Sequence, residues 1–330
     1  MATPQSSGSE RADNEQAQAV SRRSLLVAGA GATLTDAGLA RSTTAGVDDK
    51  FDKERSKKDV ADAASSDDAS WKISNGRINQ SVVHWCFEPM EVAALAKAAA
   101  AMNFKSVELV DPKHWPLLKK HGLVCAIASS HGFVRGLNHV EHHAECIEKL
   151  TQAIEASSAG GCPSVITFSG MRQGISDEEG IKNTIGGVKK VIALAEKKGV
   201  NLCLEPLNTR VDVEMKGHPG YQCDTVEWAV EVCEKVGSPR MKILFDIYHT
   251  QIMQGDVIVR IQQYKDYIGH YHTAGVPGRG DLDDRQEINY PAIMQAIVDT
   301  VYTGYVGQEF IPKGEDKIAA LRQAARLCDV

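Results

Sequence analysis

The sequence predicts an α/β protein whose folded part is one (β/α)8 barrel, and three observations support this. From residue 71 onward, eight short apolar runs alternate with eight longer stretches of helical character, which matches the count and the length, about 250 residues, of such a barrel. No glycine-rich turn follows the first apolar run, as a doubly wound open sheet would require. Four consecutive runs end on a carboxylate or a histidine, which places polar groups where barrels carry their sites.

The eight predicted strands and the eight predicted helices follow one another in strict alternation. The strands are 80–85, 106–110, 123–128, 164–168, 201–205, 241–246, 268–272 and 305–309. The helices are 89–102, 114–121, 139–159, 177–198, 224–236, 256–267, 291–301 and 315–328. Apolar residues at helical spacing between 181 and 195 predict one continuous helix over 177–198. Ser176 with Glu179, and Asp224 with Glu227, have the spacing of capping boxes that begin helices.

The segment before the barrel divides into two parts. Residues 1–45 are predicted to be disordered and contain Arg22 and Arg23 before a weakly hydrophobic stretch, 27–40, which resembles a twin-arginine export signal. This predicts a periplasmic or otherwise exported protein; without export, the protein is cytoplasmic. The apolar stretch is too short and too rich in glycine to remain as a membrane span. Residues 46–70 alternate charged and small polar residues and predict a solvated linker before the domain at 71–330.

Composition excludes few functions but bears on partners. The 330 residues are 43% hydrophobic and 24% charged, with a net charge of −6, as in ordinary soluble proteins. No basic block lies within 71–330, so nucleic acid is not expected as a partner. None of the eight cysteines forms a Cys-x-x-Cys pair, so we expect buried thiols rather than a zinc or redox motif. A homo-oligomer is compatible with this composition.

Four polar residues end the predicted fifth to eighth strands: Glu205, Asp246, His272 and Glu309. The carboxyl ends of barrel strands meet at one mouth, so these side chains are expected to converge. Three carboxylates and one imidazole around a point suit a divalent cation, Mg²⁺ or Mn²⁺. Without a cation the carboxylates would repel one another, and at least one would take up a proton.

Further polar residues near strand ends are candidates for binding a substrate: His249, Arg279, Arg172, His131 and His84. The two arginines follow predicted strands and could hold an anionic group through two hydrogen bonds. Each of these five residues also has an ordinary structural reading, such as a helix cap, a core histidine or a solvated arginine. Glu108 and His270 are expected one layer deeper, in hydrogen bonds inside the barrel.

Several motifs in this order resemble the hydroxypyruvate isomerase family of the xylose isomerase-like barrels. They are Leu204-Glu205-Pro206-Leu207-Asn208-Thr209-Arg210, Phe245-Asp246-Ile247-Tyr248-His249, Pro277-Gly278-Arg279, Glu287-Ile288-Asn289-Tyr290-Pro291 and Gly307-Gln308-Glu309-Phe310. The resemblance covers about 76–312. It implies a divalent metal and two glutamates that exchange protons, here Glu205 and Glu309. A small hydroxy-oxo acid or a sugar would be the substrate, with hydroxypyruvate converted to 2-hydroxy-3-oxopropanoate.

The sequence also departs from that family. The family has Gln at the place of His272, where ketose 3-epimerases of the same superfamily have His, and it tends to have Lys at the place of Met171. A ketose 3-epimerase is therefore an alternative. An endonuclease IV-type phosphodiesterase would need Asp-x-His where this chain has His270-Tyr271-His272. A periplasmic sugar-binding protein without catalytic activity would not need four ligands at strand ends.

Overall fold

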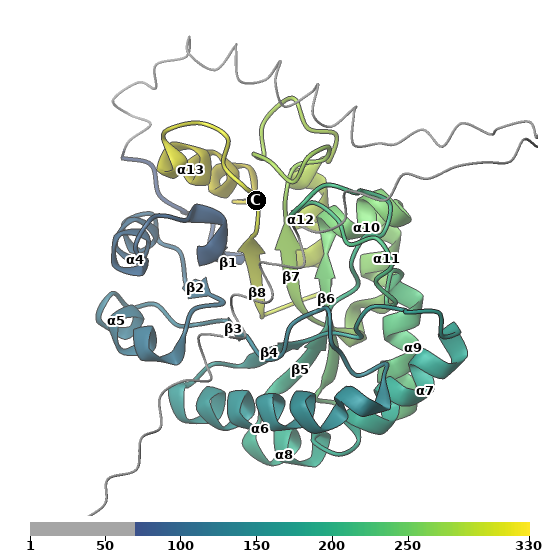
Figure 1. Cartoon of the computed structure of the whole chain (residues 1–330). Helices are drawn as coiled ribbons and strands as arrows, with labels where there is room; N and C mark the ends of the chain where they lie inside the picture. Colours follow the sequence, from purple (N-terminus) through teal and green to yellow (C-terminus); the bar gives the residue numbers. More distant parts are fainter. Residues whose placement is uncertain (1–69) are drawn as a thin grey trace, which may run out of the picture. The chain divides into compact units, whose positions relative to one another are not determined.

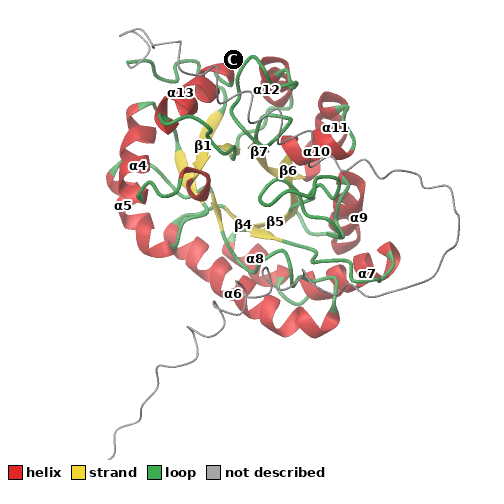
Figure 2. Ribbon diagram, turned by 45° about the horizontal axis from the view of Figure 1, so that its top comes forward, coloured by secondary structure: helices red, strands yellow, loops and turns green. Residues whose placement is uncertain are grey.

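A computed structural model describes residues 70–330, and in this range the chain folds as the predicted (β/α)8 barrel (Figures 1 and 2). Its eight strands are parallel and adjoin in the order β2-β1-β8-β7-β6-β5-β4-β3. Their bounds are β1 Asn79–Val83, β2 Ser106–Glu108, β3 Ile127–Ala128, β4 Ser164–Thr167, β5 Asn201–Leu204, β6 Met241–Asp246, β7 Ile268–Thr273 and β8 Tyr305–Gln308.

The barrel closes between β2 and the segment that leads into β3. Val107 N–H donates to the carbonyl of Val124 at 3.2 Å, and Leu109 N–H donates to the carbonyl of Ile127 at 3.1 Å. Because these bonds continue the sheet from β2 toward β3, the carboxyl ends of all eight described strands surround one opening, which Figure 2 shows almost along the barrel axis.

Helices surround the sheet in the described range (Figure 2). The α-helices are α4 Val92–Ala101, α5 Trp115–Lys120, α6 His143–Gly160, α7 Asp177–Val188, α8 Ile192–Lys198, α9 Val226–Val236, α10 Ile247–Met253, α11 Val257–Tyr264, α12 Tyr290–Asp299 and α13 Lys317–Leu327. The short 3-10 helices are η1 His84–Phe87, η2 Pro112–His114, η3 Val140–His142 and η4 Lys265–Tyr267.

Two apolar layers hold the barrel together. A small cluster, Ile127, Ile166, Cys203 and Leu244, comes from β3 to β6. The larger core contains strand residues such as Val165 and Leu202 together with the apolar faces of the helices. Adjacent strand residues thus enter different clusters, as side chains that alternate across a sheet must. The interior of the barrel, below the polar residues at the strand ends, is therefore filled by packed side chains.

The predicted helix over 177–198 is two helices in the structure, α7 and α8. The chain leaves helical geometry between Val188 and Ile192, just after Gly186 and Gly187, and glycine is a poor helix former. Gly187 lies so close to Leu137 that an added Cβ would be 2.8 Å from its Cδ2 atom. Periodicity predicted one helix because the apolar face of α7 continues into α8 across this break.

One predicted helix cap is confirmed and the other is wrong. Ser176 Oγ accepts from the N–H of Glu179 at 3.1 Å and begins α7. The cap of α9 is Thr225, whose hydroxyl accepts from the N–H of Trp228 at 3.3 Å. Asp224 instead accepts from the hydroxyl of Thr209 at 3.0 Å, which ties the segment after β5 to the beginning of α9.

The remaining sequence predictions concern residues on both sides of residue 70, where the described part of the chain begins. All eight cysteines lie in the described range and are buried and unpaired, as expected. Between residues 70 and 330 no helix combines the length and apolar character needed to cross a bilayer. The predicted export signal in 1–45 and nearly all of the predicted linker at 46–70 lie outside the described residues.

Candidate metal centre and active site

Four side chains from four consecutive strands converge at the carboxyl end of the barrel. Glu205 follows β5, Asp246 ends β6, His272 lies in β7 and Glu309 follows β8. One ligand atom from each side chain lies within 4.8 Å of those from the other three, and all four residues are buried. The sequence predicted these four residues, and the barrel brings them together because its parallel strands end at the same rim.

The donor atoms of this group face one another. His272 Nδ1 lies 3.0 Å from Oε2 of Glu309 and 3.6 Å from Oε1 of Glu205. Neither His272 Nδ1 nor Glu205 Oε1 has a hydrogen-bond partner among the described residues. Buried polar atoms are normally paired, so these two point to a ligand that both could bind.

The charges of the group lead to the same conclusion. Burial, then the neighbouring Glu309, raises the pKa of Asp246 to about 7. Burial also raises the pKa of Glu205, although the neighbouring His272 opposes it. For Glu309, Arg279 and His272 outweigh the effect of burial, and its pKa falls well below the usual value. Carboxylate oxygens together with one imidazole suit a divalent cation, which would offset the repulsion of Glu309 with Asp246 and Glu205. The residues present therefore fit the metal that the sequence predicted.

Arg279 joins this cluster as a buried guanidinium. Its Nη2 donates to Oε2 of Glu309 at 2.6 Å and lies 3.9 Å from Oδ2 of Asp246, while its Nη1 donates to the carbonyl of Met215 at 2.9 Å. The guanidinium also lies 5.2 Å from the centre of the Trp85 ring, a cation–π distance. The predicted substrate-binding arginine thus already orients Glu309 and fastens the segment after β5.

His249 presents one ring nitrogen toward the cluster. Its Nδ1 accepts from the backbone N–H of Asn208 at 3.0 Å, so the hydrogen of the neutral ring is on Nε2. Nε2 is buried, has no hydrogen-bond partner among the described residues and lies 3.7 Å from Oδ2 of Asp246. Burial, with Arg279 nearby, lowers the pKa of His249 well below its usual value. His249 can therefore donate one hydrogen bond to a bound molecule.

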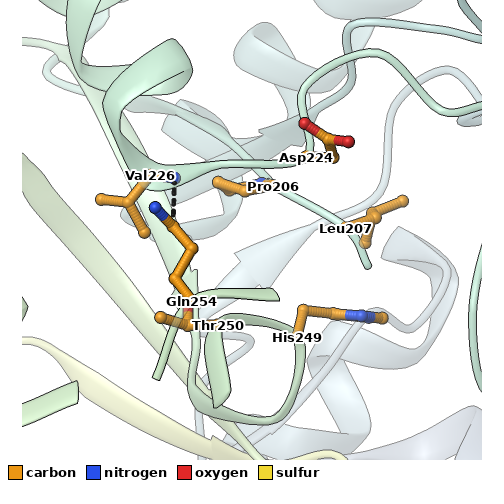
Figure 3. Close-up of a pocket in the computed structure, with 7 residues that line it drawn as sticks. All are labelled: Pro206, Leu207, Asp224, Val226, His249, Thr250 and Gln254. Carbon is orange, nitrogen blue, oxygen red and sulfur yellow. Dashed lines mark hydrogen bonds between the residues drawn. The ribbon is translucent and has the colours of Figure 1, made fainter. Parts of the chain in front are cut away.

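The local fold explains the position of His249. The Asp246 carboxylate accepts from the backbone N–H of His249 at 3.1 Å and caps α10, a helix that the sequence did not predict. Figure 3 shows the small pocket beside this ring, between the chain after β5 and α10. There Gln254 accepts from the N–H of Val226 at 3.0 Å and joins α10 to α9. One carboxylate thus has two tasks, as a candidate ligand and as a helix cap.

A second polar group lies beneath the first, as expected for Glu108 and His270. One oxygen of Glu108 accepts from Nε2 of His270 at 2.9 Å and from Nε2 of His272 at 2.8 Å. Burial opposes the charge of Glu108, but His270 and His272 outweigh it and lower its pKa to about 2. Glu108 is therefore an ionised carboxylate inside the barrel.

The other three predicted substrate-binding residues have partners outside the cluster. Arg172 pairs with Asp177 at 2.7 Å, and His84 Nε2 bonds the carbonyl of Met90 at 2.8 Å. His131 is buried, bonds the hydroxyl of Thr167 at 2.9 Å and contacts the edge of Phe168. Burial lowers the pKa of His131. These contacts are the ordinary structural alternatives for such residues, and the sequence could not exclude them.

Sequence reasoning missed His218. It lies on the segment after β5, 4.4 Å from the Phe133 ring and 5.8 Å from the His249 ring, measured between ring centres. Burial, then the charge of Arg279, lowers the pKa of His218 to about 4. No strand end marks this position, so only the residue type could have indicated it. His218 and Phe133 form an aromatic wall beside His249.

The fold is a parallel α/β barrel, and carboxylates and a histidine form a candidate metal centre at its mouth. This combination is typical of barrel enzymes, whose active sites lie at the carboxyl ends of the strands. Residues 96–329 match the family model described as xylose isomerase-like TIM barrel. The chain is 30% identical over 254 residues to a human protein named putative hydroxypyruvate isomerase, covering 70% of this chain and 88% of that protein. The chain belongs to the xylose isomerase-like TIM barrel family and is related within it to the hydroxypyruvate isomerases.

Other relatives carry different names. A protein of Pectobacterium atrosepticum named 2-oxo-tetronate isomerase is 28% identical over 232 residues, covering 66% of this chain and 86% of that protein.

Two solved structures show the same fold. An AP endonuclease, family 2, from Brucella melitensis has a TM-score of 0.64 at 23% identity, covering 74% of this chain and 97% of that chain. A D-psicose 3-epimerase from Clostridium cellulolyticum has a TM-score of 0.63 at 16% identity, covering 76% and 97%.

Proposed function

We propose that this protein is a metal-dependent isomerase that moves a proton between adjacent carbons of a small α-hydroxycarbonyl compound. The observation that carries the proposal is the convergence of Glu205 and Glu309 with Asp246 and His272 around one point. Hydroxypyruvate, converted to 2-hydroxy-3-oxopropanoate, is the favoured substrate because the human relative carries that name. The four-carbon acid in the name of the Pectobacterium relative is of the same chemical class.

Each side chain has a defined part in this reaction. Glu205, Asp246, His272 and Glu309 would hold Mg²⁺ or Mn²⁺, which polarises the substrate oxygens and lowers the cost of the negative charge that develops on them. One of the two glutamates removes the proton from the hydroxyl-bearing carbon, and a glutamate returns a proton to the neighbouring carbon. The Nε2–H of His249 donates to a substrate oxygen. Arg279 holds Glu309 in one orientation through its 2.6 Å hydrogen bond.

The test is Glu309→Gln, which keeps the shape and an oxygen for the metal but cannot carry a proton. Turnover with Mn²⁺ should fall by about 10²–10⁴-fold, the usual contribution of a general acid or base. Mn²⁺ is supplied at a concentration that keeps the variant loaded, because an amide is a weaker ligand than a carboxylate. Glu315→Gln is the matched control, because Glu315 is exposed. Near-normal turnover of Glu309→Gln would rule out a proton-transfer role for Glu309.

Hydrogen exchange in D₂O separates the roles of the two glutamates. The wild type should place deuterium in unconverted substrate, because removal of the first proton is reversible. If Glu205 removes that proton, Glu309→Gln should still show exchange; if Glu309 removes it, the variant should show none. Mass spectrometry of the recovered substrate gives the answer.

A ketose 3-epimerase is the second candidate, and His272 is the residue that favours it, since epimerases of this superfamily resemble the chain there. In that reaction the two glutamates would act on opposite faces of one carbon. An assay of short hydroxy-oxo acids beside ketoses, each with Mn²⁺, distinguishes the two. Product of changed carbonyl position supports the isomerase, and product of inverted configuration at carbon 3 supports the epimerase.

A further inference from the structure

The contact between Glu108 and His272 crosses the interior of the barrel. Glu108 ends β2 and His272 lies in β7, with β1 and β8 between them in the sheet. The carboxylate oxygen nevertheless reaches Nε2 of His272 at 2.8 Å, and both residues are completely buried. Most side-chain hydrogen bonds go to backbone or water, whereas this one joins two buried side chains that are 164 positions apart in the sequence.

Gly307 of β8 makes this contact sterically feasible. It is paired in register with His272 of β7 on one side and with Ser81 of β1 on the other. A Cβ at position 307 would lie 2.3 Å from the Glu108 carboxylate oxygen and 2.9 Å from Cδ2 of His272. The missing side chain therefore leaves the space in which the carboxylate and the ring meet.

This hydrogen bond determines which ring nitrogen of His272 faces the candidate metal centre. Because Glu108 accepts at Nε2, that nitrogen carries the hydrogen of the neutral ring, and Nδ1 keeps its lone pair. Nδ1 is the atom that lies 3.0 Å from Glu309 and 3.6 Å from Glu205. Histidines that bind metals commonly donate their other N–H to a carboxylate, which fixes the tautomer and makes the ligand more basic.

We infer that Glu108 is a positioning residue, which holds the ring of His272 so that its Nδ1 points at the metal while Glu108 itself touches neither metal nor substrate. The inference rests on the metal centre of the proposed function. His270 shares the same carboxylate oxygen at 2.9 Å, and its ring lies edge-on to that of His272 with the centres 5.1 Å apart. His270 is thus a second hydrogen-bond donor to the oxygen of Glu108 that contacts His272.

The experiment measures Mn²⁺ affinity by titration calorimetry for the wild type and three variants. Glu108→Met removes the acceptor at similar volume and should weaken Mn²⁺ binding about 10–100-fold, the usual effect of losing such a partner. Glu108→Gln keeps an acceptor oxygen without charge and should lose less than the Met variant. His270→Asn is the matched control and should lose less than about threefold, since the pair of Glu108 with His272 remains.

The outcomes separate this inference from the metal centre itself. Wild type that binds no Mn²⁺ would overturn both. Wild type that binds Mn²⁺ while Glu108→Met binds it equally well, or while His270→Asn loses as much as Glu108→Met, would overturn the role of Glu108 alone.

A spectroscopic measurement does not depend on the folding of any variant. In ¹⁵N-labelled wild type loaded with Mg²⁺, the ring signals of His272 should show a protonated Nε2 and an unprotonated Nδ1. A protonated Nδ1 with a bare Nε2 would overturn the inference. Should Glu108→Met not fold, as judged by its thermal melt, this spectrum and the Glu108→Gln titration decide.

Discussion

At the scale of single residues, Asp246 shows how one carboxylate can serve two purposes that a mutation can separate. Asp246→Asn removes a negative charge from the ligand group but keeps an oxygen that can cap α10 as Asp does. We expect Mn²⁺ affinity to fall by more than about 100-fold. Losing a residue that only hydrogen-bonds to a metal ligand costs about 10–100-fold, and the loss of a ligand itself should cost more. Calorimetric titration of the variant checks this.

Folding of the metal-free Asp246→Asn variant should be almost unaffected. Its melting temperature should stay within about 4 °C of the metal-free wild type, which for a domain of this size corresponds to roughly 1 kcal/mol. Asp266→Asn, at an exposed position, is the control for a loss of charge away from the cluster. Wild-type Mn²⁺ affinity in Asp246→Asn would show that Asp246 is not a ligand.

Residues at strand ends were predictable from sequence, and residues whose partners lie across the fold were not. Glu205, Asp246 and Glu309 each end an apolar run, and a parallel barrel directs such ends to one rim. Arg172 follows a strand in the same way, yet it pairs with Asp177 at the beginning of the next helix. Nothing in the sequence distinguishes a loop arginine that reaches the centre from one that finds a nearer carboxylate.

At the scale of secondary structure elements, α9 tests the corrected helix cap. Thr225→Ala removes the hydroxyl that accepts from the N–H of Trp228, and loss of such a cap costs about 1 kcal/mol. The free energy of unfolding from urea titration should fall by about that amount, and Thr225→Ser should recover most of it. An unchanged stability in Thr225→Ala would leave Asp224 as the residue that begins α9.

The sequence misjudged two helical segments, each for a different physical reason. Apolar periodicity reports which face is buried, but it does not report a change in direction when the face continues, as from α7 into α8. The short helix α10 begins directly at Asp246, within what looked like the end of a strand and a loop. The carboxylate of Asp246 caps this helix by accepting from the N–H of His249. The sequence pattern had assigned Asp246 to the strand. Strand order and barrel closure, by contrast, follow from the regular alternation and were predicted correctly.

At the scale of the whole molecule, the sequence before residue 70 predicts export. Replacing Arg22 and Arg23 with lysine should keep the protein in the cytoplasm, because the twin-arginine pathway reads the arginine pair. Immunoblots of periplasmic and cytoplasmic fractions measure the distribution. A variant with Lys57 and Lys58 changed to arginine is the control for altered basic residues outside the motif. Equal export of wild type and the double lysine variant would exclude this signal.

The stability of the folded barrel should depend on the metal as a whole-molecule property. A cation that binds the folded state alone stabilises it by about 2.7 kcal/mol when its free concentration is 100 times its Kd. For a domain of this size each kcal/mol corresponds to about 2–4 °C, so Mn²⁺ should raise the melting temperature of chelator-treated protein by roughly 5–10 °C. The physical reason is that only the folded barrel brings Glu205, Asp246, His272 and Glu309 together as candidate ligands. Calorimetric melts at several Mn²⁺ concentrations check the logarithmic dependence that linkage requires.

The same melts with Asp246→Asn should show little or no rise at those concentrations, because the variant keeps the fold and loses the ligand charge. A rise of equal size in both proteins would place the stabilising metal somewhere other than the strand ends.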